Sequence, residues 1–409
     1  MRKVAVTGIG LVSPVGNTAH EAFGNLMEGK SGVRRITAAF AKQLSTTVAA
    51  EVSLNMSEHF SVKQLRNFDR TTQLALLASE QAWGDSGVIL SDEEKERAGV
   101  YVGTGMGGAV SIDEATYQIY KKEVSRVSPL FITKIMCNAS ASHISIQHGL
   151  LGPCLTFSTA CSSSAVAIGE AYRLIKSGHA DVIVAGGTES LIAYSSIKAW
   201  ESLGVLAMED ASDPAASCKP FSKDRTGFVL GEGSAMVVLE EMERAKKRGA
   251  TIYGEVAGYG STADAYHITG PSVDGQARAI RQALEEASLG TDAIDYINAH
   301  GTATGANDVV ETQALKKALG ERAYSIPASS TKSMHGHLMG AAGAVEFVIT
   351  LLSIRNKAVP PTANLKIPDP ECDLDYVPNT GRPGLKVRTA MTNSFAFGGT
   401  NAVLIVKEA

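Results

Sequence analysis

Residues 155–164 read LTFSTACSSS and join an apolar, β-prone run to the helix-forming segment 162–178, SSSAVAIGEAYRLIKSG. The pattern predicts a strand over 155–160, a tight turn at Cys161 and a helix directly after the turn. A thiol on such a turn lies at the positive end of the helix dipole and near free N–H groups, which favours the thiolate. Cys161 is therefore the first candidate nucleophile.

The same alternation of strand and helix extends on both sides of this segment. It predicts parallel βαβ units between helical layers, which is an α/β fold. After KKRG at 246–249 the alternation starts again, so we expect two related halves, 1–250 and 251–409. Packing of the two halves would bring their reactive turns to one face. The expected strands are 3–8, 99–103, 155–160, 182–185, 234–240, 253–260, 293–299, 387–393 and 403–406, and the expected helices include 71–85, 164–177, 276–287 and 308–319.

Composition limits the function classes. The chain has 409 residues, 44% of them hydrophobic, and a net charge of −4, which gives no electrostatic reason to expect a nucleic-acid partner. Its five scattered cysteines form no CxxC pair, so neither a disulfide framework nor a zinc site is expected. No apolar run reaches the length of a membrane span or a secretory signal. We expect a reduced, cytoplasmic enzyme.

Two later segments carry histidines among glycines and small residues. They are 298–308, NAHGTATGAND, and 330–344, STKSMHGHLMGAAGA, which hold His300, Lys332 and His337. A cysteine, two neutral histidines and a lysine suit acyl transfer and carbanion chemistry, with Lys332 lowering the histidine pKa values. Any one of these residues alone is more often an inert core residue. Finding all four in turns rich in Gly, Ser and Thr favours the catalytic interpretation.

Four motifs together resemble one family. TACSSS at 159–164, AHGTATGAND at 299–308, SSTKSMHGHLMGAAGAVE at 329–346 and NSFAFGGTN at 393–401 are similar to the decarboxylating β-ketoacyl synthases. The nearest types are β-ketoacyl-ACP synthase II and the ketosynthase α subunits of type II polyketide synthases. The resemblance implies a thiolase-like fold, with two pseudo-equivalent βαβαβ halves packed as a five-layered αβαβα core. It also implies decarboxylative Claisen condensation of an ACP-bound acyl chain with malonyl-ACP.

The resemblance assigns roles by position. Cys161 would accept the acyl group, His300 and His337 would stabilise the enolate left after loss of CO₂, and Lys332 would keep the histidines in their working charge state. The N–H groups of Cys161 and Phe397 would form an oxyanion hole, with Phe397 also acting as a gate. Positions matching pantetheine-binding residues are Thr302 and Thr304, and positions matching supporting acids are Asp308, Glu311 and Glu346. For these three acids a solvated helix face is the competing interpretation.

Basic residues Lys63, Arg66 and Arg126 resemble a patch that docks the acidic acyl carrier protein, although an ordinary solvated surface explains them equally well. The sequence departs from the synthase II pattern at His335, usually threonine, and at Ala396, usually glycine. Residues 197–206 (IKAWESLGVL) are also bulkier than usual, which predicts a reshaped acyl channel. The expected chemistry needs no metal or organic cofactor.

The sequence leaves several alternatives open. The pathway is either fatty acid or polyketide synthesis, and the assembly is either a homodimer or a heterodimer with a chain length factor. A non-catalytic partner resembling a chain length factor is a second hypothesis, against which the retained Cys161, His300 and His337 argue. A thiolase acting on CoA substrates is a third. It would need a second cysteine as base, and Cys218 and Cys372 lie outside the motifs.

Overall fold

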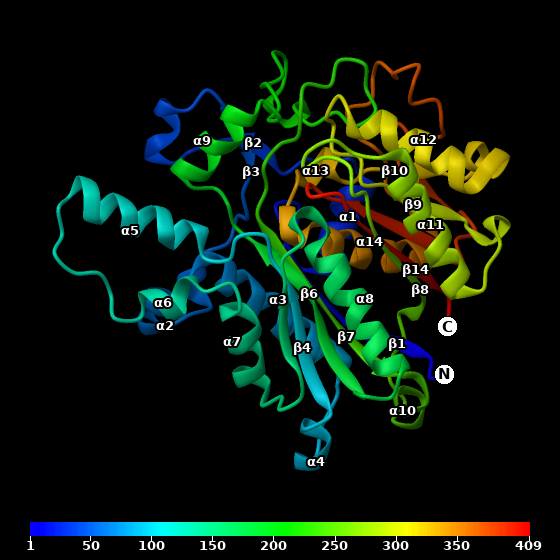
Figure 1. Ribbon diagram of the computed structural model, residues 1–409, viewed down its shortest axis with the longest axis horizontal. Helices are drawn as coiled ribbons and strands as arrows, with labels where there is room; N and C mark the ends of the chain where they lie inside the picture. The colour runs from blue at the N-terminus through cyan, green and yellow to red at the C-terminus, as the bar shows by residue number, and fades with distance from the viewer.

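The computed structural model describes residues 1–409 and contains one ten-stranded mixed sheet (Figure 1). The strand order across it is β10-β9-β13-β14-β8-β1-β7-β6-β4-β5. Two small two-stranded sheets, β2 with β3 and β11 with β12, lie outside it. The strands are β1 (Val4–Val12), β2 (Val33–Arg35), β3 (Val48–Ala50), β4 (Ala98–Gly103), β5 (Cys154–Phe157), β6 (Val182–Glu189), β7 (Gly233–Glu241), β8 (Gly254–Ala263), β9 (Tyr296–Asn298), β10 (Ala328–Ser329), β11 (Ala358–Val359), β12 (Arg382–Pro383), β13 (Thr389–Phe395) and β14 (Thr400–Lys407).

The helices alternate with these strands, as the sequence pattern predicted. They are α1 (Ala19–Met27), α2 (Val62–Asn67), α3 (Arg70–Ser86), α4 (Asp92–Lys95), α5 (Ala109–Lys121), α6 (Phe131–Ile135), α7 (Ala139–His148), α8 (Ser163–Lys176), α9 (Tyr194–Leu203), α10 (Met242–Lys247), α11 (Val273–Ala287), α12 (Asn307–Leu319), α13 (Lys332–His335) and α14 (Ala342–Asn356). None of them combines the length and the apolar character that a bilayer crossing demands.

The sheet consists of two five-stranded parts with the same logic. In one part β4 is parallel to β5 and β6, and β7 is antiparallel to both of its neighbours, β6 and β1. In the other part β9 is parallel to β10 and β13, and β14 is antiparallel to both of its neighbours, β13 and β8. A short antiparallel pairing of β1 with β8 joins the two parts. The predicted parallel βαβ units are present, but the antiparallel strands at the junction are not visible in the strand-helix alternation.

The layers follow the five-layered order that the resemblance implied. Helices α3 and α7 pack on the outer face of the first part, and α11 packs on the outer face of the second part, with α12 against it. Between the two parts lie α8 and α14, which contact strands of both (Figure 1). Helix α14 is buried from Ala342 to Ile354, as expected for a helix with protein on every side. Its lack of a polar face marks it as the central element.

Small residues allow the central helices to approach each other and the sheet. A Cβ added to Gly343 in α14 would lie 2.9 Å from Cβ of Ala165 in α8, and one added to Gly103 in β4 would lie 2.3 Å from the carbonyl carbon of Ser163. Real Cβ atoms do not approach this closely, so glycine is required at both positions. The close crossing brings the start of α8 against the carboxyl end of β4. It therefore determines where the turn at Cys161 lies.

Candidate active site

Each reactive side chain follows the carboxyl end of a strand. Cys161 comes after β5 in the short 3-10 turn Ala160–Ser162, His300 comes after β9, and Lys332 comes after β10. Ala160 has φ of 51°, a left-handed conformation that is unusual for a residue with a side chain and that turns the strand sharply into α8. The turn directs Cys161 inward, where only 8% of the residue is exposed. Its Sγ lies 3.1 Å from Nε2 of His337.

The thiol of Cys161 is protonated in the resting site. Burial raises the pKa of Cys161 to about 12, and the charge of Lys332 together with the backbone N–H groups of Phe397 and Cys161 only partly offsets it. The buried carboxylate Glu189 adds to the rise. The expectation that the helix dipole favours a resting thiolate is therefore wrong, because desolvation of the sulfur outweighs the N–H groups around it. The N–H groups of Phe397 and Cys161 do lie close to the sulfur.

Lys332 is completely buried and holds His300 in one tautomer. Its Nζ donates to the carbonyl of His300 at 2.7 Å, lies 3.3 Å from Nδ1 of the same residue, and forms an ion pair with Glu346. An ammonium group only donates, so Nδ1 of His300 accepts and the ring proton is at Nε2. Burial, and then the charge of Lys332, hold the pKa of His300 well below 6.5. His300 is therefore a neutral ring whose proton is at Nε2.

A hydrogen bond from the backbone sets the same tautomer in His337. Its Nδ1 accepts the N–H of Met339 at 3.2 Å, which leaves the ring proton on Nε2, the atom next to the sulfur of Cys161. Burial and Lys332 lower its pKa well below 6.5. The rings of His300 and His337 lie 5.5 Å apart at 84°. One ligand atom from each of Cys161, His300 and His337 lies within 4.8 Å of the others, so the three side chains are within reach of one small reactant.

The three supporting acids are fully buried, which excludes the solvated helix face as their explanation. Asp308 accepts the N–H groups of Ala303 and Phe221, and Glu311 accepts those of His300 and Gly301. Burial raises the pKa of Glu346 to about 7, against the attraction of Lys332. Glu311 therefore holds the backbone at His300 and Gly301 within the motif at 299–308, and Asp308 ties Ala303 of the same motif to Phe221. Glu346 holds Lys332.

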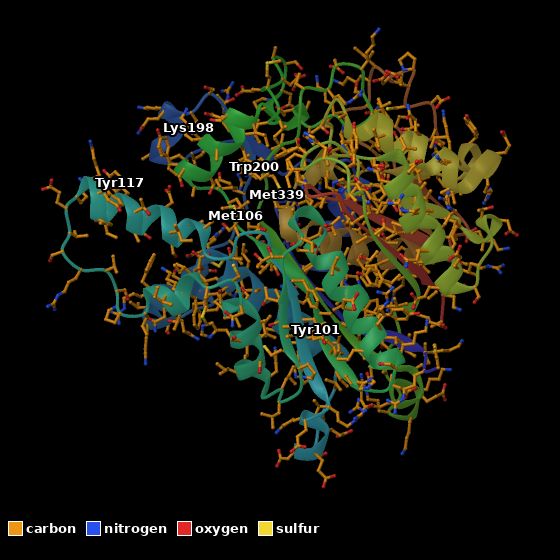
Figure 2. All side chains as sticks on the ribbon, in the orientation of Figure 1. Tyr101, Met106, Tyr117, Lys198, Trp200 and Met339 are labelled. Carbon is orange, nitrogen blue, oxygen red and sulfur yellow. The ribbon has the colours of Figure 1, made fainter.

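A cavity of about 280 Å³ opens onto these residues. Its polar wall includes Thr302 and Thr304, whose hydroxyl oxygens lie 2.9 Å apart. Its aromatic wall includes Trp200 and Phe228, with ring centroids 5.5 Å apart. Figure 2 labels Trp200 of α9 and Met339, another lining residue, and both come from segments close to the ends of the central strands. Trp200, Leu203, Gly204 and Val205 of the bulky segment 197–206 line the cavity, and the expectation of a reshaped acyl channel stays a prediction.

Phe397 lies on a tight turn beside the cavity. The turn is closed by the Ala396 N–H bonding to the Thr400 carbonyl at 2.9 Å, and Gly398 and Gly399 take φ of 85° and 71°. The Phe397 ring lies 6.2 Å from Trp200. Ala396 has no left-handed φ, so alanine replaces the usual glycine there without backbone strain. The other departure, His335, is buried and bonds only locally, with Nδ1 toward the Gly336 carbonyl and Nε2 toward Thr331.

Two site residues escaped the sequence analysis. Glu189, at the end of β6, is buried, accepts N–H groups of Gly105, Met106 and Gly340, and has its pKa raised to about 7 by burial. Arg225 donates to the carbonyls of Thr304 and Gly305 and pairs with Asp369 at 2.5 Å. The sequence did offer a signal for Glu189, because it is an acidic residue at the end of a strand that contains glycines. Arg225 had no local signal, because its partners are far away in the sequence.

The surface residues predicted for carrier docking lie elsewhere. Lys63 and Arg66 are in α2 and Arg126 is between α5 and α6, all exposed, and none lines the cavity. Cys218 and Cys372 are buried and do not line it either, so no second cysteine stands ready as a base.

One group of side chains is close enough to surround a metal ion. Cys161, His300 and His337 each have one ligand atom within 4.8 Å of the others, but both Nε2 atoms carry protons in this network and therefore donate rather than ligate.

The fold and this site define a thiolase-like protein with a cysteine and two neutral histidines at the meeting point of its two halves. Sequence profiles of the beta-ketoacyl synthase N-terminal and C-terminal domains match residues 1–245 and 253–366. A 3-oxoacyl-[acyl-carrier-protein] synthase 2 of Synechocystis sp. is 43% identical over 100% of this chain and 98% of its own length. The chain belongs to the beta-ketoacyl synthase family.

Solved structures agree with this placement. The ishigamide ketosynthase/chain length factor superposes with a TM-score of 0.93 at 34% identity, covering 100% of this chain and 99% of the other. A second similar structure is AntDE:AntF, a type II PKS acyl-carrier protein in complex with its ketosynthase bound to the hexaketide. It has a TM-score of 0.90 at 34% identity and full coverage of both chains. These relatives include both members of a synthase II type and members of polyketide systems.

Proposed function

We propose that the protein is an elongating β-ketoacyl-[acyl-carrier-protein] synthase of fatty acid or polyketide synthesis. It condenses an acyl group held on Cys161 with a malonyl group delivered by an acyl carrier protein. The observation that carries this proposal is the pair of neutral imidazoles, His300 and His337, which both keep a proton on Nε2 beside the sulfur. Hydrogen-bond donors that are already in position stabilise an enolate oxygen, and each lowers the activation free energy by about 3 kcal/mol.

The first half-reaction loads the enzyme. Sγ of Cys161 attacks the thioester carbonyl of the acyl carrier, a new C–S bond forms, and the pantetheine sulfur leaves with the thiol proton. The N–H groups of Cys161 and Phe397 receive the oxyanion of the tetrahedral intermediate. Thr302 and Thr304 hold the pantetheine arm, and the Phe397 turn gates its entry.

The second half-reaction forms the carbon–carbon bond. The malonyl carboxylate leaves as CO₂, and the electron pair moves onto the thioester oxygen, where His300 and His337 donate their Nε2 protons as hydrogen bonds. The enolate carbon then attacks the acyl thioester on Cys161. Collapse releases the β-ketoacyl carrier and a thiolate, which takes a proton from solvent. Burial, and then the charge of Lys332, keep both imidazoles neutral throughout, because a second positive charge would be poorly solvated and repelled there.

Replacement of Cys161 tests this function. Cys161→Ala should abolish the acyl-enzyme seen by intact-mass spectrometry after incubation with an acyl carrier, while thermal unfolding stays near that of the wild type. Labelled CO₂ released from malonyl carrier distinguishes condensation from a CoA thiolase, which releases none. Retention of the acyl adduct in the alanine variant would refute the role of Cys161.

A second chain is proposed at the edge of the sheet. Strand β5 is the last strand in the order, and its residues Cys154 and Leu155 are exposed, which leaves hydrogen-bonding groups free on one side. Helix α5 projects from the body and exposes Tyr117 and Tyr120 (Figures 1 and 2). We propose that this face binds a second copy. A chain length factor is the alternative partner, because two of the similar structures are ketosynthase complexes with such a subunit.

Native mass spectrometry of the protein expressed alone distinguishes the two partners, since a homodimer forms without a second kind of subunit.

The carrier surface made by Lys63, Arg66 and Arg126 is proposed on charge alone, and reversing the three charges should raise the KM for carrier substrates in a salt-dependent way. The boundary between halves at residues 250 and 251 is likewise a proposal, supported by profile matches that end at 245 and restart at 253. The cytoplasmic location stays a prediction.

A further inference from the structure

One glutamine in the cavity wall has no partner for its side chain. Gln276 lies in the first turn of α11, is fully buried, and lines the same cavity as Cys161. Its backbone N–H bonds to the Ser272 carbonyl at 3.1 Å, but neither Oε1 nor Nε2 has a hydrogen-bonding protein group. Both ends of one buried amide are therefore unused.

Such an arrangement is costly for the folded protein. Each buried polar group left unpaired costs about 1–3 kcal/mol, and an apolar side chain of similar size would avoid that cost. Neighbouring polar groups do not compensate, because they already bond one another. Asp264 accepts the side-chain amide of Asn401 at 2.6 Å and the N–H of Ser272 at 3.2 Å. Gln276 therefore needs a partner that comes from outside the chain.

The position of Gln276 indicates which part of a substrate it meets. Helix α11 packs against α12, which begins at Asn307, directly after the segment that carries Thr302 and Thr304. Residues 268–271, just before α11, line the same cavity. Gln276 is thus a polar member of the cavity lining, on a helix that packs against the helix that follows Thr302 and Thr304.

We propose that Gln276 binds the amide groups of the carrier's pantetheine arm, with Nε2 donating to a carbonyl and Oε1 accepting an N–H. The arm contains two amides between its phosphate end and its sulfur, so it supplies both kinds of group along the polar wall. This inference rests on the proposed function, because that function brings a pantetheine arm to Cys161. It makes Gln276 a substrate-binding residue that none of the family motifs in the sequence contains.

The test compares Gln276→Leu with the wild type. Free pantetheine is used to protect Cys161 from iodoacetamide, and alkylation is mapped by peptide mass because Cys137 and Cys154 are also exposed. We expect the pantetheine concentration for half-protection, and the KM for malonyl carrier, to rise about tenfold. The kcat and the alkylation rate without pantetheine should stay within twofold, and the melting temperature should hold or rise because two unpaired groups are removed.

Gln282 on the same helix is the matched control. Its Oε1 accepts the N–H of Ser261 at 2.9 Å and it does not line the cavity, so Gln282→Leu should lower the melting temperature and leave protection and KM unchanged. Unchanged protection and KM in Gln276→Leu would overturn the inference, and a lowered melting temperature with unchanged KM would assign the amide to a structural role served by buried water. A wild-type protein that releases no CO₂ would refute the proposed function alone, because the protection assay requires no turnover.

Discussion

Replacing Lys332 with methionine should separate the two halves of the reaction. The ammonium group contacts Nδ1 of His300 at 3.3 Å and forms the ion pair with Glu346. Without it, the ring of His300 is free to hold its proton on Nδ1, which removes the Nε2 donor from the enolate. Loss of one such donor costs about 2.7–4 kcal/mol, so decarboxylation should slow about 10²- to 10³-fold.

Lys332→Met should also destabilise the protein, because Glu346 is left without its partner in a fully buried site. Breaking a buried ion pair by removing one member costs about 3–5 kcal/mol. The double variant Lys332→Met with Glu346→Gln removes the stranded carboxylate and should recover much of this loss in urea unfolding. Its decarboxylation rate should stay low, since the donor to His300 is still missing.

The assay measures labelled CO₂ released from malonyl carrier by enzyme already acylated on Cys161, with acylation followed separately by intact mass. We expect acylation to change much less than decarboxylation. A Lys332→Met enzyme that decarboxylates at the wild-type rate would refute the tautomer argument. Equal losses in both steps would show that Lys332 acts on Cys161 rather than on the histidines.

Three further predictions follow from the same contacts. The free energy of unfolding should fall as the pH drops below about 6.5, because His148, His300, His335 and His337 have pKa values lowered by burial and the unfolded chain takes up their protons first. Glu189 and Glu346, whose pKa values burial raises to about 7, take up protons in the folded state and offset part of this loss. Melts between pH 7.5 and 5.5 measure the net change, and a free energy of unfolding that rises on acidification would contradict it. Arg225→Met breaks the part-buried pair with Asp369 and leaves the Thr304 and Gly305 carbonyls without their donor, so the free energy of unfolding should fall by about 1–3 kcal/mol and the KM for carrier should rise about tenfold. Urea titration and steady-state kinetics check both, and an unchanged KM would count against a role in positioning that segment. Glu311→Gln weakens the acceptor of the His300 and Gly301 N–H groups. The free energy of unfolding should fall by about 2 kcal/mol, and CO₂ release should slow. A lower free energy of unfolding with an unchanged rate of CO₂ release would limit Glu311 to a structural role.

Local sequence predicted the main elements closely. The helix predicted over 71–85 is α3 (Arg70–Ser86), and the one predicted over 164–177 is α8 (Ser163–Lys176). The antiparallel strands β7 and β8 were predicted as strands, but their direction was not, because strand polarity in a sheet depends on connections that periodicity does not report.

The sequence by itself determined the identities of Cys161, His300, Lys332 and His337 and the small residues around them, because chemistry and backbone freedom are properties of residue type. Only the tertiary structure decided their working states. Burial sets the pKa of Cys161 to about 12, and the partners of each Nδ1 set both tautomers. The desolvation of Cys161 and the charges around it depend on groups far away in the chain, such as Lys332 and Phe397, and the contacts to each Nδ1 form only when the turns that carry them are folded. For the same reason, the unpartnered amide of Gln276 could be recognised only after the cavity had been formed.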